Sequence, residues 1–258
     1  MSQAGGGKDG GGEPTKPLFG EARDIDRWMY EFIARLAHDV RAPLGAIRMW
    51  THVLRGSDDS GDKQTGLSAI DASVRSHTDL ISMLVDMSSA IVGRLALERR
   101  PVNPVVSVRS ALRIAEAEAK LHGVALEPLQ VVSGDGEPSV LGDARRLEQL
   151  AAALLSFAVT TTKSGGRVGT RVTTTGDGFE LCVSATEGTV SAADLAGLFT
   201  PYQNVGIGQP RRDFGLGLAF ARALALSHAG TLEGTHAGAG QGPVFTLRLP
   251  LAGPPPAG

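Results

Sequence analysis

The feature that most constrains the fold is a pair of long apolar stripes in the first third of the sequence. Apolar residues recur every three or four positions between 25 and 54, and again between 67 and 91. That spacing places them on one face of an α-helix, and a helix of about 30 residues is roughly 45 Å long. The polar stretch GSDDSG at 56–61 separates the stripes. The pattern predicts two long antiparallel helices joined by a short turn.

A hairpin of this kind leaves half of its apolar surface uncovered. The rest of the sequence contains no helix of comparable length that could cover it. Pairing with a second copy into a four-helix bundle is the most economical solution. We therefore expect a homodimer.

The pattern changes near residue 100, where RRPVNPVV contains two prolines and predicts a domain boundary. Beyond it we expect helices at 104–122, 143–160 and 215–228, and strands at 124–132, 167–175, 178–185, 230–236 and 243–250. Mostly antiparallel strands with helices on one face form an α/β sandwich, so the fold class is α+β. The predicted division is a Gly/Pro-rich tail 1–21, a hairpin 22–98, an α/β domain 99–250 and a second tail 251–258.

Composition argues against several classes of function. The 25 basic and 27 acidic residues nearly balance, which argues against nucleic acid as a partner. No apolar run reaches the ~18 residues of a membrane span, so we expect a cytoplasmic protein without a membrane contact. The one cysteine, Cys182, excludes an internal disulfide and a cysteine metal cluster, and its strand-like context FELCVSA predicts a buried thiol. No metal site is expected.

The segment AHDVRAPLGAI combines a histidine and a proline inside the first predicted helix. At about 100° per residue, His38 lies opposite the apolar stripe and faces solvent. The residues beside it on that face are small: Ala34, Ala42 and Gly45. His38 is therefore either an ordinary solvated side chain or a site that the surface of another protein can approach closely.

The neighbours of His38 favour the second interpretation. Pro43 removes one helical hydrogen bond and costs about 3 kcal/mol in a helix interior, which calls for a functional reason such as a local bend. Asp39 could accept a proton from one imidazole nitrogen and make the other more nucleophilic. Arg41 supplies a positive charge close to any phosphoryl group that arrives there.

These residues resemble the phosphoacceptor box of two-component sensor histidine kinases. The box has the pattern H-[DE]-x-R-x-P-L-x-x-I, matched by His38, Asp39, Arg41, Pro43, Leu44 and Ile47. The resemblance extends over about residues 22–250, since family members follow the hairpin with an ATP-binding α/β sandwich. It implies that His38 is phosphorylated and that the hairpin dimerises. The partner that follows from this is a response-regulator receiver domain, and an upstream sensor kinase is a further candidate.

The second domain is similar to the nucleotide domain of this family but departs from it at the ATP site. The segment from Asp143 to Thr162 resembles D-x-x-R-L-x-Q-x-x-x-N-L-L-x-N-A-x-K-x-T, yet Ala153 and Phe157 replace the two asparagines and Thr160 replaces the lysine. In the family the second asparagine holds Mg²⁺, and phenylalanine has no oxygen for a hard cation. Magnesium binding is therefore expected to fail.

The adenine-recognition motif D-x-G-x-G is altered as well. Ala185 stands at the aspartate, and Glu187 and Thr189 stand at the two glycines, although Gly188 could form a turn of its own. LFTPYQ at 198–203 resembles the phenylalanine box of the family, and Gly215 and Gly217 match its second glycine box. These glycines could hold an anion at a helix N-terminus, as a vestigial ATP site, or they could serve close packing.

The selective loss of ATP chemistry beside an intact phosphoacceptor box predicts a phosphotransfer protein. In this hypothesis His38 exchanges a phosphoryl group with a receiver aspartate in a phosphorelay, without autophosphorylation from ATP and without a cofactor. One alternative is an authentic ATP-dependent histidine kinase with a divergent site, which would need ATP and Mg²⁺. Another is a pseudokinase scaffold in which His38 is idle. Ala42 stands where many members with phosphatase activity have Thr or Asn, which argues against that activity.

Overall fold

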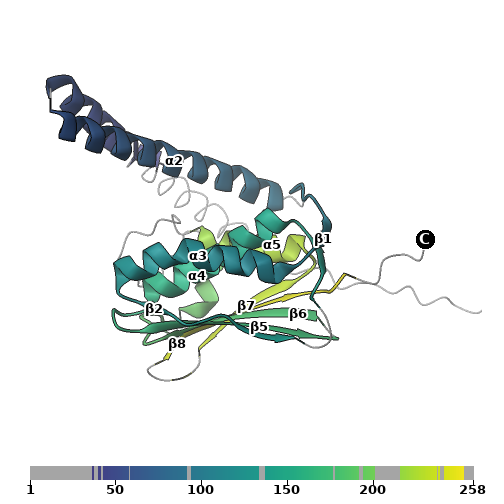
Figure 1. Cartoon of the computed structure of the whole chain (residues 1–258). Helices are drawn as coiled ribbons and strands as arrows, with labels where there is room; N and C mark the ends of the chain where they lie inside the picture. Colours follow the sequence, from purple (N-terminus) through teal and green to yellow (C-terminus); the bar gives the residue numbers. More distant parts are fainter. Residues whose placement is uncertain are drawn as a thin grey trace, which may run out of the picture.

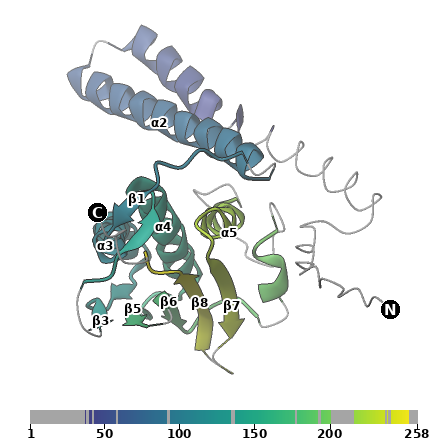
Figure 2. The same cartoon turned by 90° about the vertical axis from the view of Figure 1, so that its right-hand side faces the viewer.

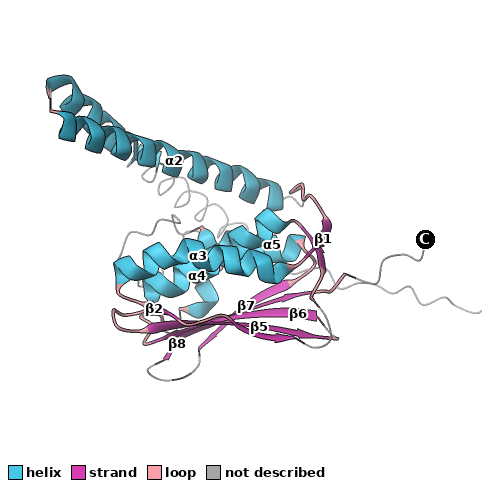
Figure 3. Cartoon of the chain, in the orientation of Figure 1, coloured by secondary structure: helices cyan, strands magenta, loops and turns pink. Residues whose placement is uncertain are grey.

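The computed structural model describes residues 37, 40–41, 43–57, 59–91, 94–133, 137–176, 178–191, 194–200, 216–236, 238 and 241–252. Two parts follow one another along the chain, a helical hairpin and an α/β sandwich (Figures 1 and 3). This arrangement confirms the predicted fold class. Among the described helices, none is both long and apolar enough to span a lipid bilayer.

The hairpin consists of a helix over residues 43–56 and the 32-residue helix α2, Ser60–Ile91. The short connection between them lies where the GSDDSG stretch predicts it. Gly66 of α2 is buried in the contact, and a Cβ atom there would lie 3.0 Å from the side chains of Leu54 and Trp50. A glycine at this position therefore lets the two helices approach closely near the turn. The part of the predicted first helix that precedes residue 37 lies outside the described residues.

The sandwich contains three helices and eight strands in its described part. The helices are α3 Pro104–His122, α4 Ala144–Thr161 and α5 Gly217–Ser227, and Leu195–Gly197 forms a short 3₁₀ turn, η1. The strands of the main sheet are β2 Ala125–Leu126, β3 Gln130–Ser133, β5 Arg167–Thr175, β6 Gly178–Thr186, β7 Thr231–His236 and β8 Gln241–Leu249. Two further strands, β1 Arg100–Val102 and β4 Val140–Gly142, form a separate antiparallel pair that the sequence analysis missed.

The main sheet has the order β2-β5-β6-β8-β7, with β3 also paired to β5. The pairs from β5 to β7 are antiparallel, whereas β2 and β3 run parallel to β5. Helices α3, α4 and α5 lie side by side over one face of this sheet (Figures 1 and 2). The predicted sandwich with helices on one face is thus confirmed.

Strand β6 shows why the sequence forms this layer. Its residues alternate between buried and half-buried from end to end, so that Phe179, Leu181 and Val183 face the helices. Cys182 lies on the opposite face and is half-buried, so the prediction of a buried thiol was wrong. Burial still raises the pKa of this thiol, which keeps it in its unreactive protonated form.

The hairpin docks on the helical layer of the sandwich. Helix α2 contacts α5, and Leu80 and Met87 of α2 are buried in the same hydrophobic core as the second domain. Figure 2 shows α2 lying above the ends of α4 and α5. The C-terminal half of α2 is therefore a structural part of both domains.

Candidate functional site

The segment around the predicted phosphoacceptor lies at the start of the described first helix. His38, Asp39, Ala34 and Ala42 fall outside the described residues. Arg41 and Gly45 are described, and both are exposed on the helix surface. A Cβ atom on Gly45 would meet no other atom within 4 Å. The surface one turn beyond Arg41 is therefore open.

Four basic side chains lie along the open side of this helix. We call Arg41, Arg48, His52 and Arg55 the basic ridge. All four are exposed, and none forms a hydrogen bond or an ion pair with any described residue. An open hollow of about 560 Å³ lies over this face and is lined by Gly45, Arg48, Met49, Thr51, His52 and Arg55. The positive charge on this face is thus uncompensated within the described structure.

The position of the second family asparagine is filled by the aromatic ring of Phe157. This residue is 1% exposed, and its ring meets that of Phe245 edge to face, with 5.3 Å between centroids and an interplanar angle of 83°. Phe245 packs in the same way on Phe199, at 6.2 Å and 89°. The guanidinium of Arg222 lies 5.6 Å from the ring centre of Phe199. Phe157 is therefore a core residue in an aromatic cluster.

The threonine hydroxyl groups at the end of α4 donate hydrogen bonds to backbone carbonyls of the same helix. Thr160 donates to Ser156 O at 2.8 Å, Thr161 to Phe157 O at 2.7 Å and Thr162 to Ala158 O at 2.7 Å. Each bond closes on the carbonyl four residues earlier in the same helix. Thr160, which replaces the family lysine, therefore caps its own helix instead of presenting a charge.

The altered adenine turn is pinned against the end of α4. Thr189 donates its backbone N–H to Thr161 O at 2.8 Å, and Gly188 forms a bridge with Thr162. The backbone of Glu187 has φ 51°, a left-handed conformation that residues other than glycine rarely adopt. The turn therefore keeps a conformation suited to glycine even though the glycine has been replaced.

The residues at this site do not fit Mg²⁺ or an adenine base. Ala153 and Phe157 offer no oxygen to a cation, and Ala185, 5% exposed, offers no acceptor to an amino group. A Cβ atom on the neighbouring Gly242 would come within 2.7 Å of Ala185 O, so the strands are tightly packed there. No cluster of three or more His, Cys, Asp or Glu side chains suited to a metal occurs in the described part of the chain.

The structure describes only one of the two glycines that match the second glycine box. Gly215 lies outside the described residues, whereas Gly217 is the first residue of α5 and is buried. Leu216 precedes the helix without a side-chain cap and is fully buried. These surroundings favour the packing interpretation of Gly217.

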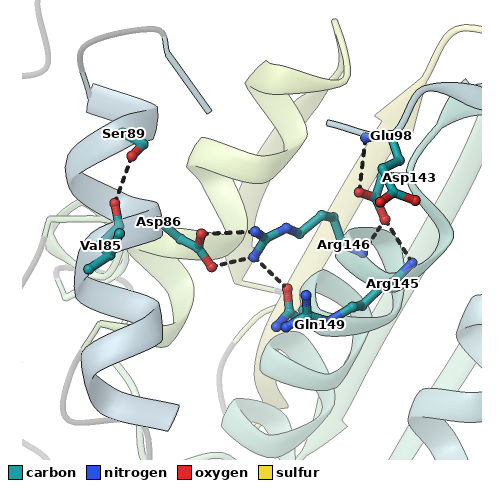
Figure 4. Close-up of polar contacts among 8 residues, drawn as sticks. All are labelled: Val85, Asp86, Ser89, Glu98, Asp143, Arg145, Arg146 and Gln149. Carbon is teal, nitrogen blue, oxygen red and sulfur yellow. Dashed lines mark hydrogen bonds and ion pairs between the residues drawn. The ribbon is translucent and has the colours of Figure 1, made fainter. Parts of the chain in front are cut away.

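The family-like residues at the start of α4 hold the two domains together, a role that sequence reasoning missed. Asp143 caps α4 by accepting from Arg145 N and Arg146 N, at 3.0 and 3.2 Å. Arg146 reaches across to Asp86 of α2 with both terminal nitrogens, and Gln149 accepts from it at 3.1 Å (Figure 4). The Arg146 and Asp86 side chains are only 12% and 18% exposed.

A second contact joins the start of α4 to the end of α5. His228 is 4% exposed and accepts the backbone N–H of Asp143 at its Nε2 atom, 3.1 Å away. Its Nδ1 atom therefore carries the proton and donates to Leu224 O at 2.8 Å. Burial lowers the pKa of His228 below its ordinary value of 6.5, because the charged imidazolium is poorly solvated there.

Two family models match the chain in the order of its two parts. The His Kinase A (phospho-acceptor) domain matches residues 28–92, and the "Histidine kinase-, DNA gyrase B-, and HSP90-like ATPase" matches residues 142–253. The first model covers the segment with His38 and the basic ridge. The second covers the helix with Phe157 and the strand with Ala185.

Individual proteins give the same result. Histidine protein kinase DivJ of Caulobacter vibrioides is 31% identical over 228 residues, which are 85% of this chain and 37% of that protein. The solved structure of histidine kinase AdeS from Acinetobacter baumannii superimposes with a TM-score of 0.60 at 20% identity, covering 84% of this chain and 98% of that one.

A solved complex of histidine kinase ThkA with the response regulator TrrA shares the fold. Its TM-score is 0.59 at 17% identity, and it covers 89% of this chain and 64% of that one. The chain thus spans well under half the length of DivJ, but it has both histidine kinase domains in their usual order. It therefore belongs to the two-component sensor histidine kinase family.

Proposed function

We propose that this chain is a phosphotransfer protein of two-component signalling, phosphorylated on His38 and not charged from ATP. The observation that carries the proposal is Phe157, whose ring is buried in an aromatic cluster where the family holds Mg²⁺. Ala185 at the adenine position supports it independently, because alanine cannot accept a hydrogen bond through its side chain. The phosphoacceptor sequence, by contrast, is complete.

His38 exchanges the phosphoryl group with an aspartate of a receiver domain, which donates the group in one direction of the reaction and accepts it in the other. In the forward step the P–O bond of the aspartyl phosphate breaks, a P–N bond forms on His38, and the carboxylate is restored. The imidazole nitrogen must be unprotonated when it attacks, and Asp39 can accept a proton from the other nitrogen. The receiver supplies its own Mg²⁺ and carboxylates, so this chain contributes only a positioned imidazole and positive charge.

The proposed class of partner is inferred from the relatives of this chain. DivJ is named a histidine protein kinase, and the ThkA structure contains a response regulator. We extend a partner of that class to this chain because it shares the phosphoacceptor domain and the fold. An upstream sensor kinase could load the receiver in a phosphorelay.

We further propose that the hairpin forms a homodimeric four-helix bundle. Large apolar side chains remain exposed along both helices of the hairpin. They are Leu44 at 49%, Met49 at 56%, Leu67 at 61%, Val74 at 47% and Ile81 at 50% exposure. Covering these side chains would remove a substantial apolar area from water. Light scattering of the purified chain should give twice the mass of 26.7 kDa.

The function is tested by mixing the purified chain with receiver domains that have been phosphorylated with labelled acetyl phosphate. We expect label on the wild-type chain and none on a His38→Ala variant. Absence of transfer from every receiver of the source organism would contradict the proposal. A pseudokinase scaffold would then remain, and cells would tolerate His38→Ala but not loss of the second domain.

A second candidate function is ATP-dependent autophosphorylation, which the match to the ATPase family model favours. Titration calorimetry with Mg-ATP separates the two. We expect no binding up to millimolar nucleotide, since neither a metal ligand nor an adenine acceptor is offered. Micromolar affinity, or label on His38 from γ-labelled ATP, would establish the kinase instead.

A further inference from the structure

An open groove of about 640 Å³ lies between α3 and residues 124–129, at the edge of the sandwich. We call it the α3 groove. Its apolar lining includes Leu112 of α3, Leu126 of β2 and Leu129, and all three are half-buried. Figure 2 shows α3 and β3 on the side of the sandwich that lies away from α5. No lining residue belongs to the hairpin or to the altered ATP motifs, so the proposed phosphotransfer does not use this groove.

The sheet is open along this groove. Strands β2 and β3 both pair with β5, and no described strand pairs with their outer side. The backbone N–H groups of Ala125 and Glu127 point toward β5 and donate to Gly166 O at 3.0 Å and to Val168 O at 2.9 Å. Because backbone groups alternate along a strand, the N–H of Leu126 points to the open side. Such an edge can pair with an added strand.

The side chains on the helix-facing side of this edge are apolar and only partly covered. Leu126 is in register with Val168, and Val131 is in register with Val172. Both of these β5 partners are completely buried in the core, so Leu126 and Val131 face the helical layer as well. Val131 is nevertheless 40% exposed. Apolar surface is therefore available to a strand that lies beside β2 and β3.

The rim that α3 contributes to the groove is basic. Its three exposed cations are Arg109, Arg113 and Lys120. None of these side chains forms an ion pair within the described part of the chain. Of the two acidic residues in the lining, Glu127 pairs with Arg167 at 3.3 Å, which leaves Glu116. The groove therefore presents a net positive charge to a ligand.

We propose that the α3 groove binds an acidic, extended segment of a partner protein, which adds to the sheet as a strand outside β2 and β3. The open edge requires an extended backbone, and the basic rim requires acidic side chains. An added strand places every second side chain beneath α3, where acidic ones meet Arg109 and Arg113 and apolar ones cover Leu126. This surface gives the chain a second partner site, which is independent of the chemistry of His38.

The test uses fluorescently labelled synthetic peptides of about ten residues and the full chain. The probe alternates glutamate with valine. One control peptide has lysine in place of glutamate, and another has the probe sequence with N-methyl groups throughout its backbone, so that it cannot donate to a strand edge. Measured by fluorescence anisotropy in about 50 mM salt, the probe should bind at least about tenfold more tightly than either control.

Two double charge reversals of equal chemistry locate the site. Arg109→Glu with Arg113→Glu changes the rim of the groove, and Arg48→Glu with Arg55→Glu changes the basic ridge as the matched control. The rim variant should bind the probe at least about tenfold more weakly in about 50 mM salt and about threefold more weakly in about 500 mM salt. It should also bind the lysine peptide more tightly than the parent does. The ridge variant should match the parent, and circular dichroism checks that both variants fold.

Hydrogen exchange measured by NMR tests the strand geometry. Saturating probe should slow the exchange of the Leu126 amide at least about tenfold, because that N–H becomes bonded to the added strand. The inference is overturned if the probe does not bind at about 1 mM, if the rim variant binds it as well as the parent, or if only the ridge variant loses binding. Binding without protection of Leu126 also overturns it, as does an RNA oligonucleotide that binds the rim more tightly than the probe. None of these outcomes bears on phosphotransfer, so failure here leaves the proposed function intact.

Discussion

The segment that follows the predicted phosphoacceptor and the helix that carries Phe157 differ in how their side chains meet their surroundings. The helix of the basic ridge presents four exposed cationic or titratable side chains that have no partner in the described structure. The nucleotide position is filled by a phenylalanine that is 1% exposed, and the hydroxyls beside it are bonded within their own helix. The polar side chains of the ridge thus remain open to water, whereas the hydroxyl groups beside Phe157 are satisfied within the protein.

The contrast has an energetic origin. Polar ligand-binding side chains in a closed cavity cost stability when nothing binds them, because they lose their contact with water. Phe157 and Ala185 carry no such cost, because both are buried apolar side chains. The exposed ridge pays no such cost in water, so its charges can be retained.

The largest expected effect comes from restoring the family asparagine. Phe157→Asn removes the ring from the aromatic cluster and buries an unpaired amide, so the free energy of unfolding should fall by about 3–5 kcal/mol. Urea denaturation followed by circular dichroism measures it. Phe157→Leu, which keeps an apolar side chain, should lose clearly less. A stable Phe157→Asn variant that binds Mg-ATP would show that the site is an open nucleotide site after all.

The next effect concerns the contact between the domains. Asp86→Asn or Arg146→Met leaves a largely buried partner unpaired, and should cost about 1–3 kcal/mol. Hydrogen exchange should increase at the C-terminal half of α2 and at the start of α4. The matched control is Arg75→Met, whose pair with Asp71 is exposed, and it should not change stability measurably. Equal effects of the two changes would refute a structural role for the contact between Asp86 and Arg146.

A smaller gain is expected at the altered adenine turn. Glu187 holds φ 51°, which costs about 1–2 kcal/mol for a residue with a Cβ atom. Glu187→Gly relieves that cost but gives up some backbone entropy, so the net gain should be about 0.5–1 kcal/mol. Glu187→Ala keeps the Cβ atom and should give no gain. Thermal unfolding of the three proteins compares them, and a loss of stability with glycine would contradict the assignment.

The smallest effect is a pH dependence set by His228. Its folded-state pKa lies below the ordinary 6.5 because of burial, so the unfolded chain takes up the proton more readily. Its contribution to stability should be complete above pH 6.5 and should be lost as the pH falls toward the folded-state pKa. Denaturation curves between pH 8 and 5 test this sign. His228→Gln should flatten the slope over that range, and an unchanged slope would assign it to other groups.

Most of the fold follows from local patterns in the sequence. The three-to-four spacing of apolar residues predicts α2, and the alternation in FELCVSA predicts β6, because both depend on periods of a few residues. The pair of β1 and β4 was missed because each strand has three residues and joins segments about 40 positions apart. Such short pairings leave no periodic trace.

At the candidate site, the sequence identifies side chains but not their contacts. That Phe157 and Ala185 cannot take their family roles stays a prediction from the sequence, and the structure adds that both side chains are buried. The contact between Asp86 and Arg146 could not be predicted, because it depends on how two domains pack. The left-handed conformation of Glu187 could not be predicted either, because the sequence does not show that the turn keeps a positive φ without a glycine.

The burial of Leu80 and Met87 in the core of the second domain has a consequence for how the molecule unfolds. Because α2 completes that core, separating the domains would expose apolar surface on both at once. The C-terminal half of α2 and the sandwich should then melt as one cooperative unit, while the end of the hairpin near Gly66 can fray on its own. We therefore expect the boundary between cooperatively unfolding units to fall inside α2, whereas the domain division near residue 100 stays a prediction from the sequence.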